Sequence, residues 1–244
     1  MPGPPDILRV HVNREEKIRI MSYQIALDGP AGAGKSTIAK AVAKRLQFVY
    51  VDTGAMYRAL GLYCRRNNAA KDDEETICRL CEEANVTISY ENGEQVIFLN
   101  GENVSRAIRT PEGGEWASVV SVFKKVREKM VKLQQELAVS ENVIMDGRDI
   151  GSVVLPNADL KIYLDADVAV RAKRRMDELI AKGQTADYDE ILAQVKDRDY
   201  RDMHRDNSPL VRVPDAVLVD SSYMSIEEVS EEIVRLFEQV KKDK

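Results

Sequence analysis

Short apolar runs alternate with longer helical patterns along most of the chain. The runs are nearly continuous and each ends in an aspartate or a turn, as expected of buried parallel strands; they are Tyr23–Leu27, Val49–Val51, Asn142–Met145, Leu160–Leu164 and Ala216–Val219. Helical periodicity lies between and after them, at Thr37–Leu46, Met56–Asn67, Val119–Val139, Val168–Lys182, Asp189–Asp202 and Ser225–Val240. This alternation predicts an α/β fold in which a doubly wound parallel sheet carries helices on both faces. Ligands are then expected at the carboxyl ends of the strands, where Asp28, Asp52 and Asp146 fall.

Two segments interrupt this alternation of strands and helices. Val86–Tyr90 and Gln95–Leu99 alternate apolar and polar residues around Asn92-Gly93, which is the signature of an antiparallel hairpin. A local hairpin does not fit inside a parallel sheet, so it predicts a small inserted subdomain. A second insert is expected at Ala169–Arg205, a long helical region of mixed charge before the last strand.

The first twenty residues differ from the rest of the chain. Met1–Ile20 carry prolines and mixed charges, and Met21 stands just before the first strand. We interpret residues 1–20 as an extension outside the working domain, either a vector remnant or the product of an upstream start codon. An ordered arm is the alternative that the sequence leaves open.

Composition narrows the class of protein. The 244 residues suffice for one α/β domain with insertions, and contents of 44% hydrophobic and 32% charged residues are ordinary for a soluble enzyme. A net charge of -5 gives no general attraction to nucleic acid, and no apolar run reaches membrane-spanning length. With three cysteines and no secretory signal, we expect a cytoplasmic monomer. Cys78 and Cys81 are interpreted as packed thiols on a helix rather than as metal ligands.

One motif carries specific chemistry. Residues 29–36 match the phosphate-binding pattern G-x-x-x-x-G-K-[ST], and they stand between a predicted strand and a predicted helix, as the motif requires. The loop and the helix N-terminus direct backbone N–H groups at phosphate. Lys35 is expected to reach the β- and γ-phosphates, and the Ser36 hydroxyl to hold Mg²⁺. The predicted ATP-binding residues are Gly29, Pro30, Ala31, Gly32, Ala33, Gly34, Lys35, Ser36 and Thr37.

Arginines cluster at other predicted loops. Arg58, Arg109 and Arg148 follow strand ends or the hairpin, and Arg198, Arg201 and Arg205 accompany Asp202 in the late helical region. Guanidinium groups bind phosphate oxygens bidentately and stay charged, so they offset the repulsion between ATP and a second phosphate. A hydroxyl acceptor usually needs a base, whereas a phosphate monoester, with a second pKa of about 6, is already ionised at pH 7. The arginines therefore favour a phosphorylated acceptor.

Together these motifs resemble bacterial cytidylate kinase. The likeness runs from about Met21 to the end of the chain. The motifs most specific to the family are Asp52–Arg58 and Asp146–Asp149, because many kinases share the phosphate loop. Ile108–Thr110, Arg198–Arg205, Ser208–Leu210 and Asp215-Ala216 also fit. The resemblance implies a P-loop kinase fold with a five-stranded parallel sheet flanked by helices. It also implies a core at about 21–75 and 140–244, a hairpin-containing insert for the nucleoside monophosphate at about 76–118, and a helical lid at about 169–206.

The resemblance also implies roles for individual residues. Lys35, Arg148 and Arg205 would be catalytic, with Arg148 close to the transferring group and Arg205 near the phosphates. The acceptor phosphate would be surrounded by Thr53, Tyr57, Arg58 and Arg109. Ser118, Arg127 and Asp149 would face cytosine, and Arg198 and Asp202 would contact the ribose. For Asp202, an ion pair with Arg198 one helical turn earlier is the alternative.

The expected function is transfer of the γ-phosphoryl group of Mg-ATP to CMP and dCMP, which gives CDP or dCDP and ADP. A carboxylate at position 149 accepts from the exocyclic amine of cytosine but repels the corresponding oxygen of uracil. Lid closure would exclude water. The rival hypotheses are a kinase with another acceptor, such as AMP, UMP or a small hydroxy acid, and a nucleotide-dependent switch without transfer chemistry.

Overall fold

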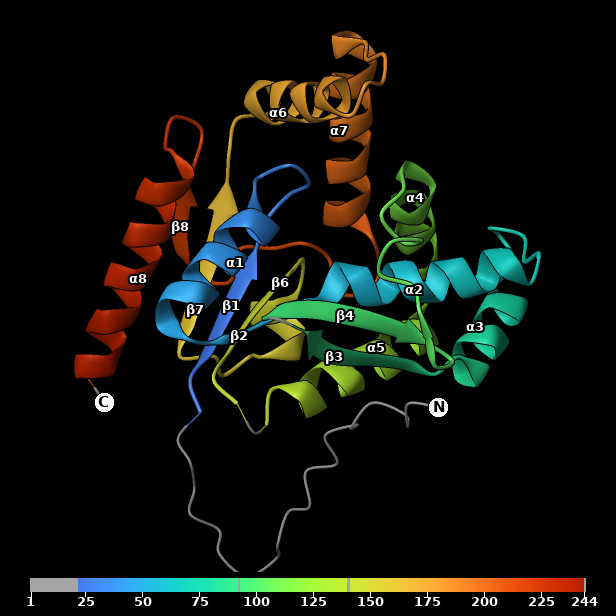
Figure 1. Cartoon of the computed structure of the whole chain (residues 1–244), viewed down its shortest axis with the longest axis horizontal. Helices are drawn as coiled ribbons and strands as arrows, with labels where there is room; N and C mark the ends of the chain where they lie inside the picture. Colours follow the sequence, from blue (N-terminus) through green and yellow to red (C-terminus); the bar gives the residue numbers. More distant parts are fainter. Residues whose placement is uncertain (1–21, 92, 140, 244) are drawn as a thin grey trace, which may run out of the picture.

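The fold was analysed in a computed structural model that describes residues 22–91, 93–139 and 141–243. The predictions for residues 1–20 lie outside the described residues, as does Asn92 of the predicted hairpin turn. The remaining elements form a parallel sheet with its helices, a smaller antiparallel sheet and a pair of helices that stands beyond the strand ends (Figure 1).

The central sheet has five parallel strands in the order β2-β6-β1-β7-β8, which confirms the predicted fold class. Side chains of the three inner strands are buried on both faces, as their continuous apolar sequences predict. Each predicted run coincides with a strand, with ends that differ by at most two residues; the bounds are β1 (Gln24–Asp28), β2 (Val49–Asp52), β6 (Val143–Gly147), β7 (Leu160–Asp165) and β8 (Val217–Asp220).

Helices cover both faces of this sheet. On one face α1 (Lys35–Leu46) and α8 (Ile226–Lys242) pack against each other and bury Ile38, Val42 and Phe237 over the strands. On the other face α5 (Lys124–Leu137) and a short π-helix, η1 (Ile150–Val154), cover Val143 and Met145.

A second hydrophobic core lies beside the sheet, around α2 (Thr53–Arg66). It is built with α3 (Glu74–Glu83), α4 (Pro111–Val120) and a three-stranded antiparallel sheet in the order β3-β4-β5. The predicted hairpin is confirmed as β3 (Val86–Glu91) and β4 (Glu94–Leu99), in register from Val86 opposite Leu99 to Glu91 opposite Glu94. The two-residue strand β5 (Glu102–Asn103) was not predicted.

The prediction of one helix over Val119–Val139 was wrong. The chain instead forms two helices, α4 and α5, separated by a break at residues 121–123. Within this break, the Ser121 backbone carbonyl accepts from Arg127 Nη1 at 3.1 Å. Thr110 begins α4 as its N-cap and accepts from the Gly113 N–H at 3.0 Å, and proline stands at the first helical position. Apolar periodicity continues across the break, so periodicity alone did not reveal it.

The late helical region is a packed pair of helices. In α6 (Val168–Ala181) and α7 (Tyr188–His204) a small cluster around Ala172, Ile191 and Val195 joins the two. The pair stands above the carboxyl ends of the strands and faces the phosphate loop (Figure 1). Within the described residues, no helix combines the length and the apolarity that crossing a membrane requires.

Candidate active site

The phosphate loop joins β1 to α1 in a tightly constrained conformation. Gly29, Gly32 and Gly34 have positive φ angles of 151°, 79° and 90°, and a Cβ on Gly29 would lie 2.0 Å from the Leu164 carbonyl oxygen. Lys35 extends back along the loop, where its Nζ donates to the Pro30 carbonyl at 2.7 Å. Burial, together with the nearby Arg148 guanidinium, lowers the pKa of Lys35 well below its usual value. A desolvated ammonium of this kind is stabilised by a bound anion.

Hydroxyl and carboxylate oxygens meet beside the loop. Ser36 Oγ donates to Asp146 Oδ2 at 2.9 Å, and the Tyr50 hydroxyl donates to Asp146 Oδ1 at 2.8 Å. Burial, and then the neighbouring Asp52, raise the pKa of Asp146. Across the described residues, no group of three or more His, Cys, Asp or Glu side chains is arranged to hold a metal ion. The Ser36 and Asp146 oxygens are nevertheless the hard ligands that Mg²⁺ prefers, so this pair fits a site that substrate phosphates complete.

Asp52 gathers the residues predicted for the acceptor phosphate. Its Oδ1 caps α2 by accepting from the Ala55 N–H at 2.8 Å, while its Oδ2 lies 3.5 Å from Arg58 Nη1 and 3.3 Å from Arg109 Nη2. Thr53 follows directly and donates from Oγ1 to the Asp146 carbonyl at 2.8 Å. The Asp52 side chain is 3% exposed, whereas the two guanidinium groups remain partly open to solvent. Asp52 therefore holds the two guanidinium groups side by side near the N-terminus of α2.

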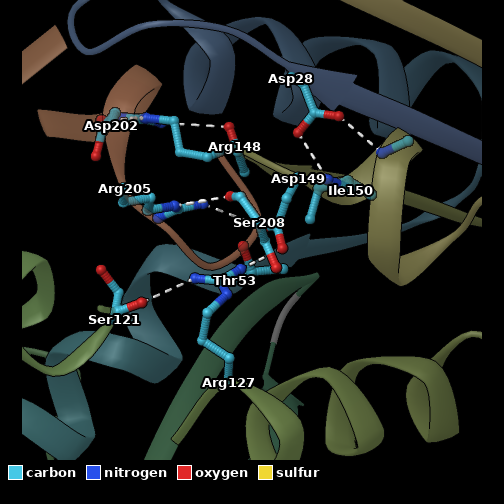
Figure 2. Close-up of polar contacts among 12 residues, drawn as sticks. Asp28, Thr53, Ser121, Arg127, Arg148, Asp149, Ile150, Asp202, Arg205 and Ser208 are labelled. Carbon is cyan, nitrogen blue, oxygen red and sulfur yellow. Dashed lines mark hydrogen bonds and ion pairs between the residues drawn. The ribbon is translucent and has the colours of Figure 1, made fainter. Parts of the chain in front are cut away.

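A buried ion pair lies deeper in the same region. Arg127 of α5 binds Asp149, and Arg205 Nη2 approaches the other carboxylate oxygen of Asp149 at 3.9 Å (Figure 2). Side chains of all three are less than a tenth exposed. Among the described residues, Arg127 Nε, Arg205 Nη2 and the Tyr57 hydroxyl are buried polar atoms without a hydrogen-bond partner. These three donors therefore keep hydrogen-bonding capacity that the described protein groups do not use.

Arg148 connects the end of β6 to α7. Its Nε donates to Asp202 Oδ2 at 2.8 Å (Figure 2), and among the described residues no ion pair joins Asp202 to Arg198. Although burial opposes it, the charges of Arg148 and Arg198 lower the pKa of Asp202. Burial, and then Arg148, lower the pKa of Arg198 to about 10. Within the described part of the chain, Arg198 Nε has no hydrogen-bond partner.

Ser118 is placed apart from the other predicted base-contacting residues. It lies on α4, and its Oγ is 3.5 Å from Nη1 of Arg201, which is itself half-exposed and paired with Asp197. In the described residues, no hydrogen bond or ion pair joins Ser118 to Arg127 or Asp149. The structure thus brings together the predicted arginines and Asp149 but leaves Ser118 at the periphery.

Comparison with known proteins identifies the family. The sequence profile of a protein family described as cytidylate kinase matches residues 25–239. The chain belongs to the cytidylate kinase family. It is 49% identical to a cytidylate kinase of Caldicellulosiruptor bescii over 219 residues, which cover 90% of this chain and 97% of the relative. It is 47% identical to a cytidylate kinase of Lactobacillus gasseri over 220 residues, or 90% and 96% of the two chains. The resemblance identified from the motifs is confirmed.

Similarity to solved structures is more remote. A shikimate kinase from Bacteroides thetaiotaomicron shares 16% identity with a TM-score of 0.44, over 88% of this chain and 98% of that chain. The assignment to the cytidylate kinase family rests on the sequence match and not on this likeness.

Two further residues contact the site, although neither was assigned a role in it from the sequence. Asp28 accepts from the Ile150 N–H at 2.8 Å and from the Gly151 N–H at 2.7 Å (Figure 2), so it holds the turn that carries Asp149. Arg171 of α6 donates to the Ala31 carbonyl at 2.9 Å. Arg171 also pairs with Asp199 of α7 at 2.7 Å, which ties both late helices to the phosphate loop.

The sequence contained only part of the signal for these residues. Asp28, Asp52 and Asp146 all end strands, which placed them at the ligand-binding edge but did not assign their hydrogen bonds. Arg171 lies within a helix that also carries Arg174 and Arg175, so nothing in its local sequence distinguished it.

Proposed function

We propose that this chain transfers the γ-phosphoryl group of ATP to CMP and dCMP, producing CDP or dCDP and ADP. The observation that carries this proposal is the buried Arg127–Asp149 pair, which presents a carboxylate acceptor and unpartnered donors in the region where the arginines converge. Membership of the cytidylate kinase family supports the same acceptor.

Base selection follows from hydrogen-bond complementarity. Asp149 accepts from the N4 amine of cytosine, and Arg127 donates to the O2 and N3 acceptors. Uracil presents an oxygen to the carboxylate and an N–H to the guanidinium, so two buried groups are left mismatched. Mismatches of this kind cost a few kcal/mol, which makes UMP a poor acceptor.

The 5′-phosphate of the acceptor binds near the N-terminus of α2. Arg58 and Arg109, held by Asp52, contact its oxygens together with Thr53 and Tyr57. Arg198 and Asp202 contact the ribose. At pH 7 the acceptor phosphate is already ionised, because its second pKa is about 6, and attack requires no protein base. This explains why the region is rich in guanidinium groups.

Lys35 and Arg148 lie between the phosphate loop and the acceptor region. Lys35 is buried and is already directed along the loop by its bond to Pro30, and the Arg148 guanidinium is partly buried beside it. They stabilise the charge that spreads over the transferring group, with Arg205 contributing from the acceptor side. Ser36 and Asp146 would hold Mg²⁺, which when bound neutralises charge on the ATP phosphates.

Segment roles follow from these placements. Residues 76–118 form the insert that supports the acceptor site, and residues 169–206 form a lid that excludes water from the phosphates. The bond from Arg171 to the Ala31 carbonyl supports a link between the lid and the phosphate loop. Location in the cytoplasm and a monomeric state stay predictions.

Isotope tracing tests the proposal directly. The wild-type chain is incubated with ATP labelled at the γ-phosphate, with CMP or without an acceptor, and the products are separated. The expected result is label in the terminal phosphate of CDP and little inorganic phosphate. Release of labelled inorganic phosphate at the same rate with and without CMP would instead indicate hydrolysis without transfer.

A further inference from the structure

The β3–β4 hairpin is fastened to the edge of the central sheet by side chains. Among the described residues, β2 is an edge strand of the five-stranded sheet and pairs only with β6. An edge strand presents backbone N–H and C=O groups that no neighbouring strand satisfies. Tyr90 of β3 donates from its hydroxyl to the Tyr50 carbonyl at 2.9 Å, and Gln95 of β4 contacts Asp52, two residues further along the same edge.

The Gln95 side chain takes the place of a pairing strand at Asp52. Its Oε1 accepts from the Asp52 N–H at 2.7 Å, and its Nε2 donates to the Asp52 carbonyl at 3.3 Å. A primary amide has the same donor and acceptor as a peptide group, so it can satisfy both backbone groups of one residue. Asp52 is 2% exposed, and burying these groups without partners would be costly.

Asp52 is also the residue that holds the acceptor arginines. Its carboxylate caps α2 at the Ala55 N–H and lies within 3.5 Å of Arg58 and Arg109. The direction of this carboxylate depends on the backbone of Asp52, because the side chain has only two rotatable bonds. Gln95 therefore acts on both guanidinium groups through one backbone position, although Gln95 contacts neither of them by a hydrogen bond.

We infer that Gln95 is a positioning residue for the acceptor phosphate: it fixes Asp52, and through it the pair Arg58 and Arg109. The inference rests on the proposed function, since it assigns these arginines to the phosphate of CMP. It makes the hairpin a part of the acceptor site and not only a cover for the second hydrophobic core.

The inference separates phosphate binding from base reading. Arg127 and Asp149 are carried by α5 and by the turn after β6, neither of which Gln95 contacts by a hydrogen bond in the described structure. A change at Gln95 should therefore weaken binding of CMP but not of cytidine, which has no phosphate. The preference for CMP over UMP should also stay unchanged, because both carry the same phosphate.

The test compares Gln95→Ala with Tyr90→Phe. Both remove a contact between the hairpin and the β2 edge, but only the first contact reaches Asp52. For Gln95→Ala we expect the KM for CMP to rise about tenfold, the size of effect that loss of one buried contact produces. The KM for ATP, the inhibition constant of cytidine and the CMP-to-UMP ratio should each change less than about twofold. Tyr90→Phe should leave the KM for CMP within about twofold of the wild type.

Melting temperature is measured for both variants to identify a merely structural role. If Gln95→Ala lowers the melting temperature but leaves the KM for CMP unchanged, the inference is overturned. An equal rise in KM in Tyr90→Phe would also overturn it, because any loosening of the hairpin would then suffice. Failure of the wild type to phosphorylate CMP would instead refute the proposed function, so the two failures are distinguishable.

Discussion

Replacing Asp149 by asparagine tests how the base is read, because the two side chains have nearly the same shape. In the wild type the carboxylate is buried and accepts from Arg127, with Arg205 3.9 Å away. A hydrogen bond to a charged group contributes about 1.5–3 kcal/mol, which corresponds to about 10- to 150-fold in kcat/KM. We therefore expect kcat/KM for CMP to fall about 10²-fold, while the KM for ATP changes less than about twofold.

Activity with UMP distinguishes base reading from a general loss. The asparagine amide can donate to the uracil oxygen that the carboxylate repels, so kcat/KM for UMP should hold or rise. The ratio of kcat/KM for CMP to that for UMP should then fall at least about a hundredfold. The assay follows ADP release in steady state with each acceptor at saturating ATP.

Stability must be measured alongside, because the substitution also breaks a buried ion pair. Leaving Arg127 without its partner is expected to cost about 3–5 kcal/mol of unfolding free energy, a large part of the stability of an ordinary domain. Asp215→Asn is the control for loss of a carboxylate: Asp215 is exposed and binds Lys161 at 2.7 Å, and within the described residues it forms no ion pair with an arginine. Equal losses with CMP and UMP in Asp149→Asn, or an altered ratio in Asp215→Asn, would refute the assignment.

Three further predictions follow from single contacts. Burial raises the pKa of Asp28 from 3.8 to about 6, so its contribution to stability is fully present below pH 3.8 and is lost as pH rises through about 6. Urea unfolding should therefore show the wild-type advantage over Asp28→Asn shrinking by about 3 kcal/mol across this range, and a constant difference would contradict it. Gly61→Ala places a Cβ 2.7 Å from Trp116 Cβ and should lower the free energy of unfolding by about 1–3 kcal/mol; an unchanged melting temperature would show that the contact relaxes freely. Ser36→Ala removes the hydroxyl bonded to Asp146, so a Mg²⁺ titration of activity should shift its midpoint upward at least about tenfold, and an unshifted midpoint would exclude Ser36 as a ligand.

The central sheet could be predicted from the sequence because its signals are local. Each strand is a short apolar run, and the helices between them are amphipathic. The start of α4 was missed although Thr110-Pro111 is a recognisable helix start, and the break at residues 121–123 was missed because apolar periodicity continues across it. The π-helix η1 could not be predicted, because its first N–H groups are satisfied by Asp28, more than a hundred residues earlier in the chain.

The candidate site was predictable to the extent that it consists of motifs. The phosphate-loop motif by itself predicts binding of a nucleotide polyphosphate. The arginines at strand ends lie where ligands bind in α/β sheets. The assignment of Arg127 and Asp149 to the cytosine came from family resemblance, whereas the ion pair between the two side chains was not predicted. Contacts such as Gln95 with Asp52 depend on how a hairpin docks on an edge strand, and no local pattern encodes that docking.

Turnover of CMP, dCMP, UMP and AMP by the wild-type chain, measured side by side with a reaction lacking acceptor, tests the central claim most directly. If Asp149 and Arg127 read cytosine and the arginines bind its phosphate, CMP and dCMP should release ADP rapidly, UMP at least about a hundredfold less efficiently, and AMP hardly at all. Equal activity with all four acceptors, or slow ADP release that no acceptor accelerates, would contradict the account.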